Sequence, residues 1–178
     1  MIEFFLKGGI LMYPIALCSI IGVAIFINKM LQYRIIMKEI DHPLEEILKR
    51  EPAIMKPILE AINEGCNEME LSVIGTRQVR KLEQGLSWLG LITTIAPLLG
   101  LTGTVAGMIK AFMVIAESSS VSPSLLAGGI WEALITTAAG LLVAIPLHVA
   151  HHYLEKKADE IAFLMKEITL SLYMRCKD

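Results

Sequence analysis

Three long stretches without charged side chains constrain this chain more than any other feature of its sequence. The first runs from Gly8 to Asn28, the second from Gln84 to Ile109, and the third from Ser122 to His152, which Glu132 alone interrupts. At about 1.5 Å of rise per residue, a helix of this length crosses a hydrocarbon core roughly 30 Å thick. We therefore predict an all-α integral membrane protein with three transmembrane helices.

The positive charges predict the direction in which the chain crosses the bilayer. Lysine and arginine residues gather between the first two apolar stretches and again after the third. The connection from Glu117 to Ser122 contains neither, and the segment before the first stretch contains Lys7 alone. Because cytoplasmic segments carry an excess of lysine and arginine, we expect the N-terminus outside the cytoplasm and the C-terminus inside.

These boundaries give the predicted organisation of the chain. We expect an outer N-terminal segment with the first transmembrane helix (1–28), a cytoplasmic helical segment (29–84), the second transmembrane helix (85–116), a short outer loop (117–121), the third transmembrane helix (122–152) and a cytoplasmic C-terminal helix (153–178). Apolar residues at helical spacing predict helices in the cytoplasmic segment, broken at Pro43, Pro52 and Pro57. A similar apolar stripe predicts that the third membrane helix extends into the cytoplasm.

Composition and motifs exclude several classes of function. The 54% hydrophobic content and mean hydropathy of +0.60 suit a bilayer, and the net charge of −2 argues against nucleic acid as a partner. The cysteines are scattered, which indicates neither a disulfide framework nor a zinc site. His148 and His152 have the spacing of metal ligands, but no convincing third ligand accompanies them, so we predict no metal. Without a nucleophile elbow or a phosphate loop, we predict no enzymatic activity and no cofactor.

Small residues repeat along the second apolar stretch. They recur every three or four positions and so share one face of a helix: Ala96, Gly100, Gly103 and Gly107. A face of small side chains lets another helix approach closely, and we interpret it as a packing surface. The lining of a pore is the alternative, and Pro97 could bend the helix there.

Glu132 is the residue that the membrane interpretation must explain. An ionised side chain in the centre of a membrane helix costs roughly 2.5–3.5 kcal/mol, so it needs compensation. Protonation would supply it, as would hydrogen bonds to hydroxyl groups or trapped water, and either would suit a proton path. Helical spacing places Thr136 near the face of Glu132 and Thr137 to its side. In the second stretch, Thr94 offers another hydroxyl group.

Two runs of residues resemble the MotA/TolQ/ExbB proton channel family. They are IAPLLGLTGTVAGM at 95–108 and GIWEALITTAAGLLVAIP at 129–146. Three spans are most like the ExbB and TolQ branch. The resemblance implies a homopentamer in the bacterial inner membrane that encloses a dimer of a single-span ExbD- or TolR-like subunit. It further implies work on a TonB- or TolA-like protein, powered by the proton motive force.

The resemblance also implies roles for single residues. Glu132 matches the glutamate of the family's third helix, and Thr137 matches its pore-facing threonine, whereas helical spacing favours Thr136. Some relatives have a threonine directly before Ala-Pro; Ile95 stands there in this chain, with Thr94 one position earlier. A structural membrane scaffold that conducts no protons is the alternative function. A secondary transporter is disfavoured because inverted halves are not evident in the sequence.

Overall fold

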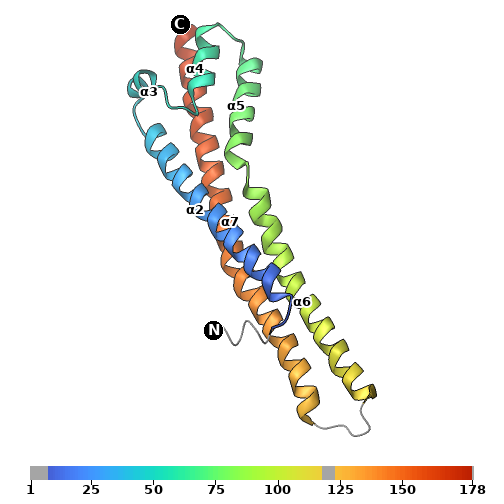
Figure 1. Cartoon of the computed structure of the whole chain (residues 1–178). Helices are drawn as coiled ribbons and strands as arrows, with labels where there is room; N and C mark the ends of the chain where they lie inside the picture. The colour runs from blue at the N-terminus through green and yellow to red at the C-terminus, as the bar shows by residue number, and fades with distance from the viewer. Residues whose placement is uncertain (1–7, 118–122, 178) are drawn as a thin grey trace. The chain divides into compact units, whose positions relative to one another are not determined.

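The computed structural model describes residues 8–117 and 123–177, and its ordered elements are helices (Figure 1). In chain order they are α2 (Met12–Ile40), α3 (Leu44–Arg50), α4 (Lys56–Asn63), α5 (Glu68–Glu83), α6 (Leu86–Glu117) and α7 (Pro123–Lys177). Neither of the two described ranges contains a strand. Helices α2, α6 and α7 are each long and apolar enough to cross a membrane. The predicted all-α membrane fold with three spans is confirmed.

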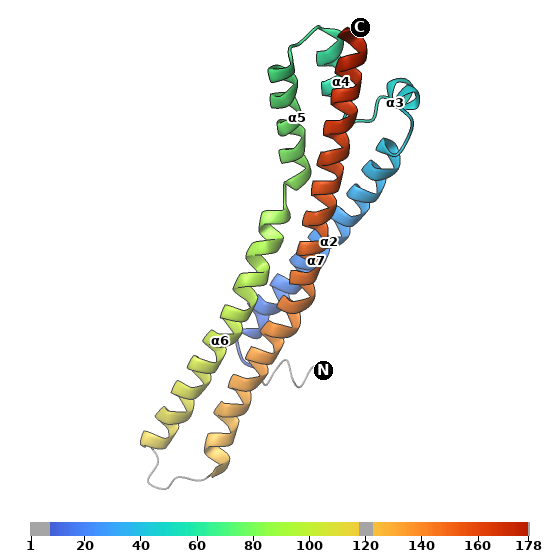
Figure 2. The same cartoon turned by 180° about the vertical axis from the view of Figure 1, so that it is seen from behind.

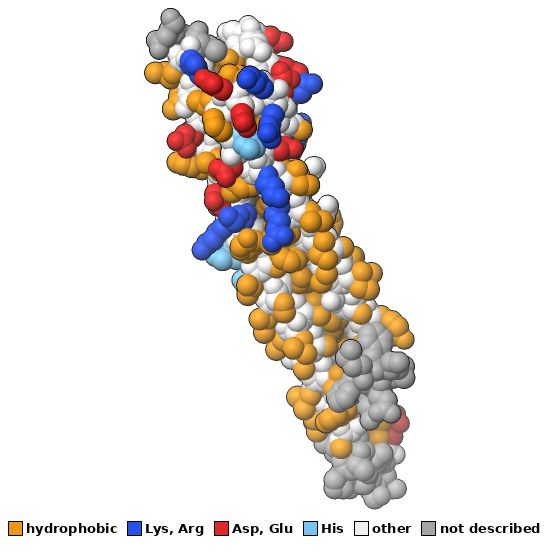
Figure 3. Space-filling view, turned by 90° about the vertical axis from the view of Figure 1, so that its left-hand side faces the viewer, with side chains coloured by type: hydrophobic (Ala, Val, Ile, Leu, Met, Phe, Trp, Pro, Cys, Tyr) orange, Lys and Arg blue, Asp and Glu red, His pale blue; other side chains and the backbone are white. Residues whose placement is uncertain are grey.

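The chain divides into two compact units. The first comprises Met1–Phe26 and Trp88–His151, and the second comprises Ile27–Ser87 and His152–Asp178. On the face drawn in Figure 3, apolar side chains cover most of the first unit, whereas lysine, arginine and acidic side chains gather over the second. An apolar exterior suits contact with lipid, and a charged exterior suits water. The predicted outer loop lies mostly outside the described residues, because residues 118–122 are not described.

In the first unit, α6 and α7 are packed with their backbones in contact. A Cβ atom added to Gly140 would lie 2.5 Å from the carbonyl oxygen of Ala96, and one added to Gly107 would lie 2.9 Å from that of Gly129. The residue numbers of the contacting positions increase along α6 as they decrease along α7, so the two helices are antiparallel. Both ribbon views show them side by side (Figures 1 and 2). Small side chains permit this close approach.

Helix α2 joins the first unit through α7. A Cβ atom on Gly22 would overlap the side chain of Leu147, and one on Gly8, before the start of α2, would lie 3.2 Å from Cγ2 of Ile135. The residue numbers of the contacting positions increase in the same direction along both helices, so α2 runs parallel to this part of α7. The outward faces of the three helices stay apolar, as at Ile20, which is 68% exposed. Such side chains suit lipid or another subunit.

In the second unit, α3, α4 and α5 enclose a core with the last part of α2 and α7. Its buried side chains include Ile36, Ile47, Met55, Ile58, Leu71, Leu82, Leu154, Ile161 and Met165. Breaks fall near Pro43 and Pro52, as predicted, since Pro43 precedes α3 and Pro52 lies between α3 and α4. The predicted break at Pro57 is wrong, because Pro57 lies in the first turn of α4. A proline is tolerated there since the backbone N–H that it lacks would have no partner within the helix.

The break between α5 and α6 is held by side chains from α2. Gly85 adopts a left-handed φ of +98°, which glycine tolerates, and it stands between the end of α5 and the start of α6. The carbonyl oxygen of Leu82 accepts hydrogen bonds from Nζ of Lys29 and from the hydroxyl of Tyr33, each at 2.9 Å. Carbonyls in the last turn of a helix lack partners within the helix, and a cation there is favourable. Lys29 and Tyr33 therefore cap α5.

We expect Tyr33→Phe to lower the free energy of unfolding by about 0.5–1.5 kcal/mol, because one of two donors to Leu82 is lost. Adding Lys29→Met should raise the loss to about 1–3 kcal/mol, because the carbonyl then has neither donor. Denaturant unfolding of the purified protein, followed by circular dichroism, measures both effects. Tyr153, which is 44% exposed, gives the control Tyr153→Phe, expected to change the same quantity by less than about 0.5 kcal/mol. Equal effects of the two tyrosine substitutions would contradict the cap.

Candidate functional site

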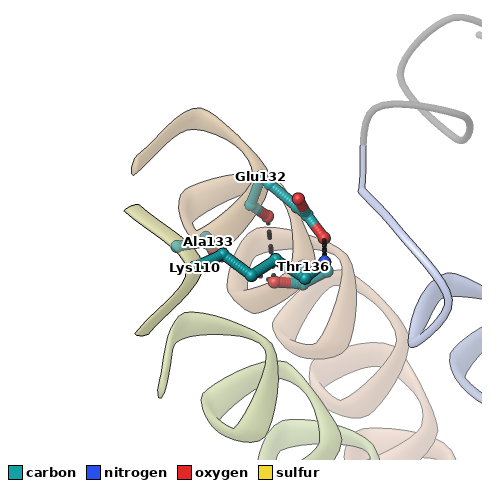
Figure 4. A network of polar contacts seen from close by, with 4 residues as sticks. All are labelled: Lys110, Glu132, Ala133 and Thr136. Atoms are coloured by element: carbon teal, nitrogen blue, oxygen red, sulfur yellow. Dashed lines mark hydrogen bonds and ion pairs between the residues drawn. The ribbon is translucent and has the colours of Figure 1, made fainter. Parts of the chain in front are cut away.

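Glu132 lies in the first unit, on the part of α7 that faces α6 and the start of α2. Its Oε1 is 2.8 Å from Nζ of Lys110, which comes from α6 (Figure 4). The Glu132 side chain is 26% exposed and that of Lys110 is 60% exposed within the single chain. A carboxylate within an apolar bundle is thus compensated by a cation from the neighbouring helix, which reduces the cost of placing either charge there.

The turn before α2 closes over the same carboxylate. Gly9 has a φ of +69°. A Cβ atom at this position would overlap Oε1 of Glu132. Backbone conformation and space both require glycine here. Three segments of the chain, namely this turn, α6 and α7, therefore meet at one carboxyl group.

The two neighbouring threonines take different roles. Thr136 is buried, and its hydroxyl donates to the backbone carbonyls of Ala133 at 2.8 Å and Glu132 at 3.1 Å (Figure 4). This is the common bonding of a threonine to its own helix, and the Glu132 carboxylate does not take part in it. Thr137 instead donates to the carbonyl oxygen of Gly100 in α6, at 2.9 Å. Of the two hydroxyls, that of Thr137 therefore links the helices.

Thr94 lies apart from these contacts. Its hydroxyl donates to the carbonyl oxygen of Gly90, one turn earlier in α6, at 3.2 Å, and its side chain is exposed. The structure brings together Glu132, Lys110 and the Gly9 turn, and it places Thr94 on the surface of the single chain. A surface position on a membrane helix is open to lipid or to another subunit.

The small residues of α6 lie against α7. Ala96 is fully buried, and the three glycines at positions 100, 103 and 107 are buried as well. A Cβ atom on Gly100 would lie 3.0 Å from backbone atoms of Thr136 and Thr137, and one on Gly103 would overlap the Thr136 side chain. Within one chain this face is occupied by a helix, as a packing surface requires.

Lys110, the partner of Glu132, was not among the site residues predicted from the sequence. Protonation, hydroxyl groups or trapped water were the compensation predicted for the carboxyl group. The contact depends on the register of the antiparallel pair, in which Gly107 packs opposite Ala133. One helical turn separates Gly107 from Lys110, so this register brings the lysine to the level of Glu132.

The described residues contain no group of three or more histidine, cysteine, aspartate or glutamate side chains that could hold a metal ion. His152, one of the two histidines with ligand spacing, has its Nδ1 3.8 Å from Oε2 of Glu155. His151 points at α6, where its Nε2 would lie 3.0 Å from a Cβ atom on Gly90. The imidazoles of His151 and His152 therefore have different neighbours.

Comparison with known proteins adds an independent line of argument. A family model described as "MotA/TolQ/ExbB proton channel family" matches residues 33–167. "Biopolymer transport protein exbB1" of Vibrio cholerae is 30% identical over 176 residues, which cover 85% of this chain and 77% of the relative. "Putative biopolymer transport protein ExbB-like 1" of Synechocystis sp. is 30% identical over 169 residues, covering 82% and 66%. "Tol-Pal system protein TolQ" of Haemophilus influenzae is 34% identical over 109 residues, covering 61% and 44%.

Proposed function

The chain belongs to the MotA/TolQ/ExbB proton channel family, and from this premise we propose that it forms the ring of an inner-membrane proton channel. The channel couples the proton motive force to mechanical work on the cell envelope, in a TonB-dependent or Tol-type system. Relatives named for biopolymer transport and for the Tol-Pal system support both possibilities. The family consists of transport channels, which agrees with the predicted lack of enzymatic activity.

One observation carries the proposal. A carboxyl group of α7 lies within an apolar helical unit and is paired with a cation from α6 at 2.8 Å. Ionisable side chains inside membrane segments are costly, and those that are kept usually serve ion or proton pathways. The interhelical hydrogen bond of Thr137 supports a polar lining near this position. Glu132 and Thr137 are therefore our proposed proton pathway. Thr94, on the surface of α6, and Thr136, buried in α7, are its further proposed members.

The mechanism needs a partner. In the proposed assembly, five copies of this chain surround two copies of an ExbD- or TolR-like single-span subunit, and protons pass from Glu132 to a carboxylate of that subunit. Moving one charge through 100 mV releases roughly 2.3 kcal/mol, which can bias a conformational step. Several protons would be needed for larger work on a TonB- or TolA-like protein. The N-terminus is proposed to lie in the periplasm and the C-terminus in the cytoplasm.

Co-purification with the single-span subunit tests this assembly. We expect the two chains to leave the membrane together in a five-to-two ratio, which native mass spectrometry measures. Vesicles that contain both subunits should conduct protons under an imposed potential, and vesicles that contain this chain alone should not. If the two chains form a stable complex and neither kind of vesicle conducts protons, the result would instead favour a structural membrane scaffold.

A further inference from the structure

Lys110 lies inside its apolar helix and not at the helix end. Seven residues follow it before α6 ends at Glu117, about 10 Å at 1.5 Å per residue. Directly after it come Ala111, which is 4% exposed, and the apolar side chains of Phe112 and Met113. A lysine at the membrane interface needs no partner, because water solvates its ammonium group. One within the apolar part of a helix needs a counter-charge.

The structure supplies that counter-charge at close range. Nζ of Lys110 donates a hydrogen bond of 2.8 Å to Oε1 of Glu132, from the other helix of the antiparallel pair (Figure 4). The same oxygen faces the backbone of Gly9, where a Cβ atom could not fit. The carboxylate is thus held from one side by a cation and confined from another by the turn before α2.

We propose that Lys110 is a positioning residue, whose ammonium group holds the Glu132 carboxylate between α6 and the turn at Gly9 and serves as its counter-charge in the proton cycle. This inference rests on the proposed function, since it gives Lys110 a role in proton transfer through Glu132. Lys110 does not carry the transferred proton. It acts through the carboxylate and is not part of the relay.

In the proposed cycle one proton enters at Glu132 and one leaves from it. An incoming proton binds a carboxylate oxygen of Glu132, and the ion pair with Lys110 becomes a hydrogen bond from the ammonium group to a neutral carboxyl group. The proton then leaves for an acceptor carboxylate on the single-span subunit, and the ion pair forms again. Without the cation, the ionised state of Glu132 stands alone in an apolar site, where it is costly. The ammonium group of Lys110 therefore offsets the charge that Glu132 carries after the proton has left.

The experiment measures proton flux into vesicles that contain the complex of both subunits. Lys110→Gln and Lys110→Met should each lower the flux at least about tenfold, whereas Lys110→Arg should keep it within about threefold of the parent because the cation is retained. Lys81→Gln, at an exposed position of α5, is the matched control and should leave the flux unchanged. Co-purification of the subunits establishes that each variant still assembles.

A double-mutant cycle separates positioning from a general effect on packing. Because Glu132→Gln alone should abolish the flux, the cycle is measured on unfolding of the purified protein in detergent: Lys110→Gln should destabilise the Glu132→Gln variant less than it destabilises the parent, since the two side chains contact each other. If Lys110→Gln conducts as the parent does, or if Lys110→Arg assembles but conducts as poorly as Lys110→Gln, the role assigned to Lys110 is wrong. Equal flux in the parent and in Glu132→Gln would instead overturn the proposed function itself.

Discussion

Proton flux through vesicles containing Glu132→Gln and the single-span subunit is expected to fall to the level of vesicles without protein. Glutamine has nearly the shape of glutamate, and its carbonyl oxygen can still accept the hydrogen bond that Lys110 donates at 2.8 Å. An amide, however, neither takes up nor releases a proton at physiological pH. The substitution therefore removes the proposed chemistry and retains most of the local geometry. A pH-sensitive dye inside the vesicles measures the flux.

Two further variants show whether the loss is specific to Glu132. Glu117→Gln replaces an exposed carboxylate at the end of α6 and should leave the flux unchanged. Thr137→Ala removes the hydroxyl that donates to Gly100, so it should reduce flux in part, through looser packing of α6 on α7. Parent-like flux in an assembled Glu132→Gln complex would reject a titrating role. Loss of assembly would make the carboxyl group a structural one.

The three spans were predictable because a bilayer imposes a length and a composition that the sequence displays directly. A run of about twenty residues with few or no charges is typical of a transmembrane helix, so α2, α6 and α7 could be predicted from the residues alone. The break at Pro57 was mispredicted for a local reason. A proline stops a helix in its interior but is favourable in its first turn, and the sequence does not state where α4 begins.

The site was predictable in part. Glu132 stands out because it is a charge within an apolar run, which needs no knowledge of neighbouring helices. Its partner Lys110 belongs to another helix, and a contact between helices depends on their register. Periodicity along one helix cannot supply that register. The same reason explains the two threonines: helical spacing relates Thr136 to Glu132, but the bond from Thr137 to Gly100 exists only once α6 is in place.

The register of α6 and α7 should be the most sensitive feature of the first unit, and Gly140→Ala tests it. The added Cβ atom would lie 2.5 Å from the carbonyl oxygen of Ala96, which is backbone and cannot rotate away. We expect the free energy of unfolding to fall by about 1–3 kcal/mol, as for other overpacked interiors. Gly128→Ala is the matched control in the same helix, because no described atom lies within 4 Å of its Cβ position. The Gly128→Ala substitution should raise the free energy of unfolding by about 0.5–1 kcal/mol.

Unfolding of the purified variants in detergent, followed by circular dichroism, measures this difference, and proton flux measures its consequence. Separating α6 from α7 at Gly140 would lengthen the bond between Thr137 and Gly100 and shift Lys110 away from Glu132. Gly140→Ala should therefore lower both stability and flux, although it changes no polar group. If the alanines at positions 140 and 128 have equal effects on stability, close backbone contact does not set the register. If stability falls and flux does not, the alignment of Lys110 with Glu132 tolerates movement of the helices, and their register does not control the channel.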